Sequence, residues 1–220
     1  MKTDTAFHYW GQEWARTEAG SKWQHAEAEV LAFAQILPQG ARVLDLGAGV
    51  GRHALAFARM GFSVAALDAA EEGVAEIRRV AGAEGLAIDT HVGMMTALPY
   101  PDAHFDHVLS WNVIYHGDEV VLRTTIAEIA RVLKPGGTFL GTMLSARRIP
   151  VERAKAHGRE ISRNTWVFES EGDDDKIHPH YFCNGRDLLE LFSAFEVCRL
   201  EDREHETPGS WHWHLLAERL

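Results

Sequence analysis

Val43-Leu-Asp-Leu-Gly-Ala-Gly-Val-Gly51 is the stretch that decides the fold of this chain. Residues 42–46 are aliphatic enough for a buried strand, and residues 52–60 carry apolar side chains at helical spacing. Glycines at 47, 49 and 51 permit a sharp turn and let a ligand lie against the main chain without a Cβ in the way. The sequence therefore predicts a strand–turn–helix unit of a kind that many nucleotide-binding proteins share.

The spacing of these glycines differs from that of dinucleotide-binding loops. Those loops require Gly-x-Gly-x-x-Gly, whereas here the third glycine comes one position early and Arg52 takes its place. Asp45, at the end of the first strand, would repel a pyrophosphate but would accept hydrogen bonds from an ammonium group. Asp68 ends the next strand, where its two oxygens can accept both hydroxyls of a ribose. The pair predicts a ligand with a cationic amino-acid end and a ribose, which describes S-adenosylmethionine.

Helical and strand-like segments alternate along the chain. Helices are predicted at 6–20, 22–36, 52–60, 70–84, 118–133 and 185–193, and strands at 42–46, 62–67, 87–92, 105–110, 138–144, 195–201 and 211–219. Such alternation is typical of a parallel sheet covered on both faces. The fold class expected is α/β: a Rossmann-like, seven-stranded, mostly parallel sheet with helices on both faces and an antiparallel C-terminal hairpin.

The length of 220 residues fits one domain, 1–220. Within it we expect an N-terminal helical lid (1–38), a cofactor-binding core (40–145), a polar acceptor-side loop region (146–182), and a C-terminal helix and hairpin (183–220).

The composition of the chain limits the classes of partner that it is expected to bind. The formal net charge is −10, with no basic run, which disfavours a nucleic-acid substrate. Two cysteines, Cys183 and Cys198, do not make a secreted disulfide framework. With no apolar signal segment at the start and no run of about 20 apolar residues, we expect a cytoplasmic protein without membrane contact. Composition makes no prediction of oligomeric state.

Four motifs in order resemble those of the class I S-adenosylmethionine-dependent methyltransferases, and most closely the small bacterial members of generic or tellurite-resistance-like type. They are Val43–Arg52, Ala66–Asp68, Leu98–Ser110 and Arg131–Gly137. The resemblance implies a transferase that methylates a small-molecule acceptor by in-line transfer, with S-adenosylmethionine as cofactor and S-adenosylhomocysteine as product. The alternatives are a non-catalytic protein of this fold that binds or senses the cofactor, and an NAD-dependent oxidoreductase.

The resemblance also implies a set of cofactor-binding residues. Gly47, Ala48 and Gly49 would line the methionine moiety with Asp45 behind them, and Asp68 would hold the ribose. The remaining members of the set are Met94 and Met95 against the adenine, Trp111 beside the cofactor, Gly51, Arg52, and Trp14 from an aromatic lid with Tyr9 and Trp10. Many relatives have aspartate at position 94, so recognition of the adenine here should depend on backbone groups and packing. The alternative for Tyr9, Trp10 and Trp14 is that they simply pack against the core.

Two segments are candidates for the acceptor side. Ligands of open α/β sheets bind beyond the carboxyl ends of the strands, where residues 110–116 lie. Asn112 and Tyr115 would bind the acceptor, and His116 would act as a base because histidine titrates near neutral pH. In the second segment, His180 is the other catalytic candidate, and His178 and Tyr181 are substrate-binding candidates. The alternative for both segments is a purely structural loop.

Metal binding is not expected. His178/His180 and His212/His214 have His-x-His spacing, but each pair needs a further ligand. The second pair lies in a run with the period-two pattern of a strand, which by itself explains two histidines on one face. The acidic run 173–175 is interpreted as a solvated loop.

Overall fold

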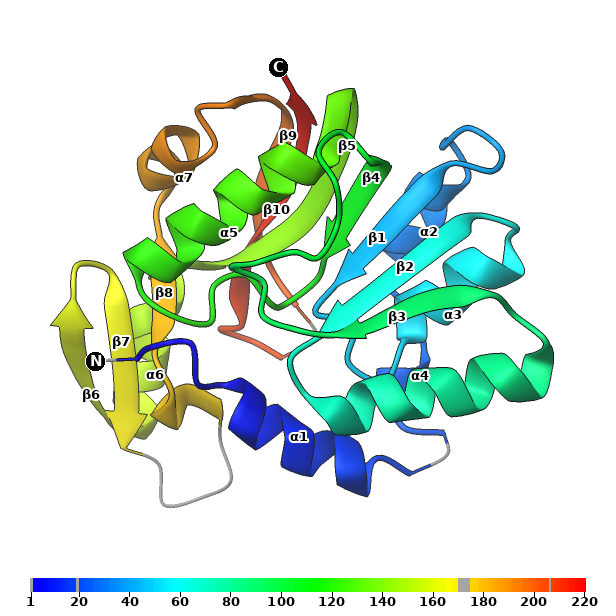
Figure 1. Ribbon diagram of the computed structural model, residues 1–220. Helices are drawn as coiled ribbons and strands as arrows, with labels where there is room; N and C mark the ends of the chain where they lie inside the picture. Colours follow the sequence, from blue (N-terminus) through cyan, green and yellow to red (C-terminus); the bar gives the residue numbers. More distant parts are fainter. Residues whose placement is uncertain (1, 19, 170–174, 206) are drawn as a thin grey trace.

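The computed structural model describes residues 2–18, 20–169, 175–205 and 207–220. Its centre is a twisted sheet in which five parallel strands follow the order β3-β2-β1-β4-β5 (Figure 1). These strands are β1 (Arg42–Leu46), β2 (Ser63–Asp68), β3 (Ile88–Val92), β4 (Phe105–Ser110) and β5 (Leu133–Ser145). Antiparallel to β5 runs β10 (Trp211–Arg219), which pairs in turn with β9 (Phe195–Glu204). The predicted Rossmann-like α/β fold with its C-terminal hairpin is confirmed.

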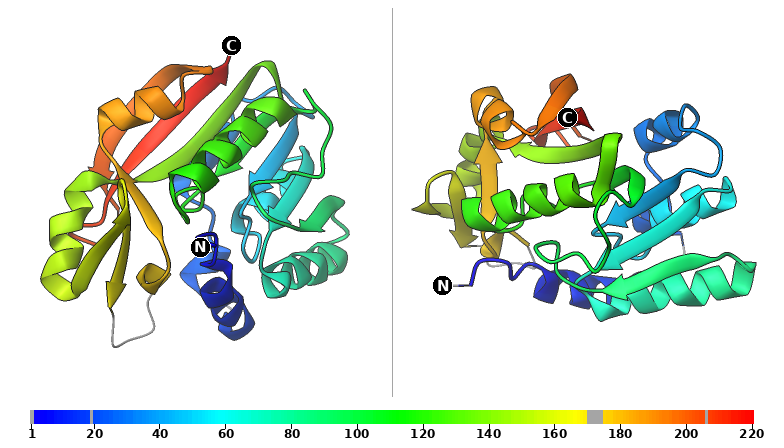
Figure 2. Two further views of the ribbon diagram at one scale, coloured as in Figure 1. Left: turned by 60° about the vertical axis from the view of Figure 1, so that its left-hand side comes forward. Right: turned by 45° about the horizontal axis from the view of Figure 1, so that its top comes forward.

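Helices cover both faces of this sheet (Figure 2). They are α1 (Phe7–Arg16), α2 (Ala28–Ala34), α3 (Arg52–Arg59), α4 (Glu71–Glu84), α5 (Glu119–Val132), α6 (Ile149–Lys155) and α7 (Gly185–Leu191). Successive residues of a strand point to opposite faces, and β1 shows the result. Leu44 joins the core under α5 and α7, whereas Val43 joins the core under α2 and α3.

The segment between β5 and α7 has more regular structure than expected. The sequence predicted a loop region over 146–182, which is wrong in detail. The described residues hold η2 (Ala146–Arg148), α6, η3 (Asp175–Ile177), the antiparallel hairpin of β6 (His157–Ser162) and β7 (Thr165–Glu169), and β8 (His180–Cys183). Since β8 pairs with the end of β5, the described sheet has ten strands, three more than predicted. The polar side chains on the outer face of the hairpin hid its strand pattern.

The predicted helix over 22–36 is interrupted. A short η1 (Lys22–Gln24) and α2 are separated by an extended stretch at 25–27. There the Glu27 N–H donates to His53 Nε2 at 3.3 Å, and the Glu27 carboxylate pairs with Arg52 at 2.8 Å. These contacts tie the chain to the start of α3, and they outweigh the helical pattern of the local sequence.

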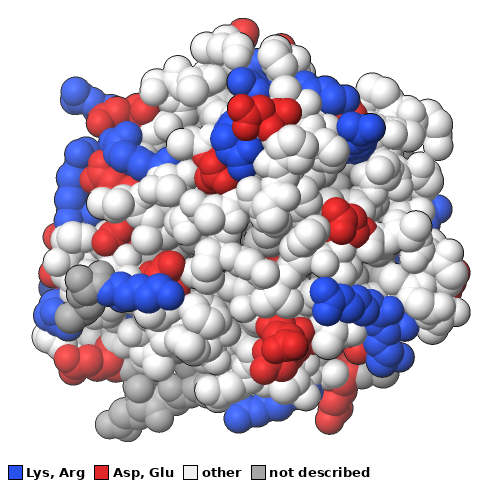
Figure 3. All heavy atoms as spheres, viewed as in Figure 1, with Lys and Arg blue, Asp and Glu red and all other residues white. Residues whose placement is uncertain are grey.

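The surface carries charges of both signs in small groups. On the face seen in Figure 3, acidic and basic side chains lie interspersed. No helix among the described residues is long and apolar enough to cross a membrane. The parallel strands bring their carboxyl ends, with Asp68 and the segment after Ser110, to one edge of the sheet, and the site is built there.

Candidate active site

The turn after β1 has a backbone that requires glycine. Gly47 and Gly49 have φ of +74° and +54°, in the left-handed region that other residues rarely adopt. A Cβ at Gly47 would lie 2.3 Å from Val113 Cγ1, and one at Gly49 would lie 2.8 Å from the ring of Trp14. Both positions therefore need glycine for their conformation and for the close approach of their neighbours.

A cavity opens over this turn, and we call it the cofactor cavity. Its walls come from the N-terminal helix, the glycine turn, and the ends of β2, β3 and β4. Nine of the eleven residues that the sequence assigned to the cofactor line it: Trp14, Gly47, Ala48, Gly49, Arg52, Asp68, Met94, Met95 and Trp111. It is also lined by Asp4, Phe7, Trp10 and Trp23, of which only Trp10 was named from the sequence.

Asp68 is held rigidly at the edge of this cavity. Its Oδ2 accepts the Gly49 N–H and its Oδ1 accepts the Ala70 N–H, both at 2.8 Å. Burial raises the pKa of this carboxyl, although the backbone donors oppose the shift. Each carboxylate oxygen keeps a second lone pair. Asp68 can therefore still accept hydrogen bonds from two neighbouring hydroxyls.

Asp45 and Gly51 do not line the cofactor cavity. The Asp45 carboxylate turns toward α3, where its Oδ2 accepts the Ala54 N–H at 2.9 Å. Burial raises the pKa of Asp45 to about 7. A Cβ at Gly51 would lie 2.6 Å from Ile77, so this glycine serves the packing of the turn against α4. The motif located both residues correctly in the chain but did not show which way they face.

Three indole rings close one side of the cofactor cavity. Trp10 stacks on Trp14 with 5.0 Å between ring centroids, and Trp23 meets both edge-on. The indole N–H groups of Trp10, Trp14 and Trp111 are buried and find no hydrogen-bond partner within the described chain. Each buried unpaired donor costs about 1–3 kcal/mol. Rotation of these side chains toward the cavity would let the N–H groups donate to carboxylate and hydroxyl oxygens of a ligand, and S-adenosylmethionine has both.

A second cavity adjoins the first, and we call it the acceptor cavity after the ligand expected there. The two share a wall formed by Trp10, Trp23, Arg52, Trp111 and Asn112. The backbone of Asn112 is left-handed, and both its N–H and its side chain contact Thr142 Oγ1. Beyond the wall the cavity is lined by rings and charged groups, including Tyr115, Arg148, Asp175, His180, His205, His212 and His214.

His116 and His180 meet where the two cavities join. An isolated β-bridge connects their backbones, and their ring centroids are 4.7 Å apart. Burial lowers the pKa of His116 to about 4, so that the ring is neutral at pH 7. Burial alone would raise the pKa of Asp175, but His180, His116 and Lys176 outweigh it and hold that pKa well below its usual value. Of the acidic run interpreted as solvated, 173 and 174 lie outside the described residues, and the side chain of Asp175 is only 16% exposed.

Comparison with known proteins agrees with this architecture. The family described as "Methyltransferase domain" matches residues 43–137. A ubiquinone biosynthesis O-methyltransferase of Agrobacterium fabrum is 28% identical over 82% of this chain and 73% of its own length. One from Paramagnetospirillum magneticum is 36% identical over 49% of this chain, a stretch that spans only 42% of that protein. The crystal structure of the PH0226 protein from Pyrococcus horikoshii superposes with a TM-score of 0.75, covering 95% of this chain and 99% of that one at 19% identity.

Residues 43–137 belong to the methyltransferase domain family, and the resemblance to the class I S-adenosylmethionine-dependent methyltransferases is confirmed. S-adenosylmethionine is therefore the cofactor of this chain. The alternative of an NAD-dependent oxidoreductase is not supported. The comparisons do not confirm the tellurite-resistance-like subtype.

Two of the acceptor-side expectations do not lie in either cavity of this methyltransferase. The Nδ1 of His178 contacts Thr5 Oγ1 at 2.9 Å, away from the junction. Tyr181 is 1% exposed, and its hydroxyl accepts a hydrogen bond from Asn164 Nδ2 at 3.1 Å. Neighbouring residues of β8 face opposite ways. Because His180 points toward the cavities, Tyr181 points into the core.

A histidine cluster on the far side of the acceptor cavity was not assigned to the site from sequence. The rings of His205 and His212 stack with centroids 3.8 Å apart, and His205 Nε2 lies 2.9 Å from His214 Nε2. His214 Nδ1 lies 2.8 Å from Glu29 Oε2 and 2.9 Å from Arg203 Nη2. The period-two pattern correctly put His212 and His214 on one face of a strand. No local signal brings His205 or Glu29 to that face.

Proposed function

We propose that this methyltransferase transfers the methyl group of S-adenosylmethionine to an oxygen atom of a small organic molecule bound in the acceptor cavity. The observation that carries the proposal is the wall of five residues shared by the two cavities. A methyl group presented at that wall would face the acceptor cavity directly. In-line displacement needs the attacking atom to lie opposite the leaving sulfur, so alignment across the wall accounts for much of the rate.

Oxygen is favoured among the acceptor atoms by the names of the relatives. The Agrobacterium fabrum relative, which aligns over 82% of this chain, is an O-methyltransferase by name. The acceptor cavity suits a polar ring: Tyr115, His205 and His212 offer faces for stacking, and Arg148 offers a guanidinium. A small molecule rather than a nucleic acid fits the formal net charge of −10.

Each group of site residues receives a role in this proposal. The cofactor supplies an electrophilic methyl group when bound. Gly47–Gly49 let its methionine end lie against the backbone, Asp68 holds the ribose, Met94 and Met95 pack on the adenine, and the indoles of Trp14 and Trp111 donate to its oxygens. Asn112 and Tyr115 position the acceptor. His116 and His180, at the junction of the cavities, act at the reacting oxygen.

The test is acceptor-dependent formation of S-adenosylhomocysteine. The purified protein is incubated with S-adenosylmethionine and a panel of phenols, catechols, carboxylates, amines and thiols, and with a small-metabolite extract of cells. Product that appears with hydroxyl compounds, and not without acceptor, supports the proposal. Product confined to amines or thiols would overturn the oxygen assignment. Binding of S-adenosylhomocysteine by calorimetry with no product from any mixture would overturn catalysis in favour of a cofactor sensor.

A further inference from the structure

His116, Asp175 and His180 form a compact cluster that the sequence did not anticipate. One atom from each, an imidazole nitrogen or a carboxylate oxygen, lies within 4.8 Å of the other two. The residues come from three places: the loop after β4, η3, and the start of β8. His116 lines the cofactor cavity, whereas Asp175 and His180 line the acceptor cavity. The cluster therefore lies at the point where a methyl group would pass from one ligand to the other.

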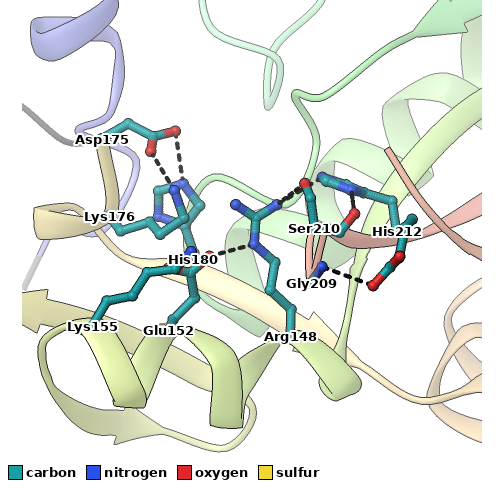
Figure 4. Close-up of polar contacts among 10 residues, drawn as sticks. Arg148, Glu152, Lys155, Asp175, Lys176, His180, Gly209, Ser210 and His212 are labelled. Atoms are coloured by element: carbon teal, nitrogen blue, oxygen red, sulfur yellow. Dashed lines mark hydrogen bonds and ion pairs between the residues drawn. The ribbon is translucent and has the colours of Figure 1, made fainter. Parts of the chain in front are cut away.

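The hydrogen bonds of His180 leave one nitrogen facing another electron pair. Its Nδ1 lies 2.8 Å from the His178 carbonyl, which can only accept, so the ring proton of the neutral form lies on Nδ1. Its Nε2 then carries a lone pair, and it lies 3.3 Å from Asp175 Oδ2, a second acceptor. Figure 4 shows both Asp175 oxygens directed at Lys176 and His180. Either a proton on Nε2 or a metal cation between the two atoms removes the repulsion between two such acceptors.

His116 presents the same situation from the other side. Its Nε2 is buried without a hydrogen-bond partner in the described chain, and it lies 3.5 Å from the same Asp175 Oδ2. The residue is only 8% exposed, so water does not freely satisfy this atom. The backbone holds the two rings in place, because Gly117 N–H donates to the Pro179 carbonyl and Tyr181 N–H to the Tyr115 carbonyl.

We propose that His116, Asp175 and His180 bind a divalent transition-metal ion of the zinc or cobalt class. Ligands about 2.0–2.1 Å from a tetrahedral zinc lie about 3.3 Å from one another, and Asp175 Oδ2 lies 3.3 Å and 3.5 Å from the two imidazole nitrogens. Two imidazoles and one carboxylate select these metals over calcium and magnesium. The surroundings also fit. His180 donates its other N–H to a carbonyl, and Asp175 Oδ1 lies 3.1 Å from Lys176, as the supporting contacts of metal ligands usually do.

The proposed ion would act on the acceptor, and this step rests on the proposed function. Three protein ligands leave a tetrahedral ion one open position, which the acceptor oxygen fills. Binding lowers the pKa of the acceptor hydroxyl, whose proton leaves to water. The oxygen lone pair then forms the bond to the methyl carbon. The carbon–sulfur bond breaks, and its electron pair stays on sulfur as the neutral thioether.

The experiment measures metal binding apart from catalysis. The full chain is stripped with a chelator and titrated with Zn²⁺ by calorimetry, and Co²⁺ is added separately to record its visible absorption. We expect one ion per chain. His180→Ala and Asp175→Asn should each weaken Zn²⁺ binding at least about 100-fold, more than the usual loss for a supporting residue. His178→Ala is the matched control: it removes the other histidine of the same His-x-His pair and should bind as wild type does.

Three outcomes would overturn the metal site. The first is that the wild type takes up no Zn²⁺. The second is that His178→Ala and His180→Ala lose the same amount of Zn²⁺ affinity. The third is that the Co²⁺ absorption spectrum of His180→Ala is the same as that of the wild type. Unchanged binding of S-adenosylhomocysteine by each variant shows that the variant is folded. Failure of the two proposals can be told apart. Acceptor methylation by a chain that binds no metal overturns the metal site alone, whereas metal uptake without methylation of any acceptor overturns the proposed function alone.

Discussion

The two sides of the site hold their buried carboxylates in opposite ways. On the cofactor side, burial raises the pKa of Asp45 to about 7 and raises that of Asp68, and the compensating groups are chiefly backbone N–H donors. On the acceptor side, Glu29 and Asp175 line the cavity, and Glu152 of α6 lies behind it, paired with Arg148 at 2.6 Å. Arginine, lysine and histidine side chains around them hold their pKa values low.

This contrast shows what each side lacks. The acceptor side carries its own counter-charges, so its carboxylates are ionised with no ligand present. The cofactor side has carboxyl groups that gain from a nearby cation.

The largest expected effect compares stability with pH on the two sides. The folded pKa of Asp45 is raised from 3.8 to about 7, so its protonated form stabilises the fold and that contribution is lost as the pH rises toward 7. Relative to Asp45→Asn, the wild type should lose about 4 kcal/mol of unfolding free energy between about pH 4 and pH 7. Urea titrations across this range measure the difference. A difference that stays constant with pH would refute the contrast.

For Glu152, on the acceptor side, we expect folding stability to change with pH in the opposite direction. Arg148 and neighbouring lysines outweigh its burial and lower its pKa. Its stabilising contribution is therefore present above the ordinary glutamate pKa and is lost as the pH falls through the folded value. Relative to Glu152→Gln, the wild type should gain stability as the pH rises, in the same urea titrations.

The next effect isolates the glycine turn. Gly47→Ala should destabilise the fold by about 3 kcal/mol, from the cost of a left-handed backbone and the clash with Val113. Gly40→Ala is its matched control: φ is +73° there, against +74°, but no atom lies within 4 Å of the added Cβ. It should lose about 1–2 kcal/mol. Thermal unfolding with and without S-adenosylhomocysteine compares them, and equal losses would show that the contact with Val113 is unimportant.

Asp68→Ala tests the ribose contact. It should weaken binding of S-adenosylhomocysteine by about 1–3 kcal/mol, because the sugar hydroxyls and two backbone donors lose their acceptor. Asp102→Ala, which removes an exposed acid, serves as the control. Calorimetry gives both affinities, and wild-type affinity in Asp68→Ala would mean that the ribose is bound elsewhere.

The smallest effect belongs to the histidine cluster. His205→Ala removes a ring that stacks on His212 and contacts His214. With an acceptor from the methylation assay, we expect KM for that acceptor to rise by a factor that corresponds to about 1 kcal/mol of binding free energy. The affinity for S-adenosylhomocysteine should stay constant. A change in cofactor affinity alone would show that this cluster contributes to cofactor binding and not to acceptor binding.

The same division explains what could be predicted from the sequence. The turn at 47–51 and Asp68 act through neighbouring backbone, so a motif a few residues long fixes their positions. The contact of His116 with His180 depends on pairing between segments more than sixty residues apart, through the β-bridge and the folding of an insertion. Sequence spacing suggested His178 as the partner of His180, whereas the fold supplies His116 and Asp175. The direction in which Asp45 faces was likewise beyond a one-dimensional pattern.

The packing of α1 against α4 has a consequence for the speed of the enzyme. Gly11 lies so close to α4 that a Cβ there would be 2.9 Å from Glu72 Oε2, and the ring of Trp14 covers the glycine turn. A ligand lying against the glycine turn shares its space with the Trp14 ring, and α1 would have to shift if that ring blocked its exit. Where such a shift is slower than methyl transfer, release of S-adenosylhomocysteine sets the turnover rate.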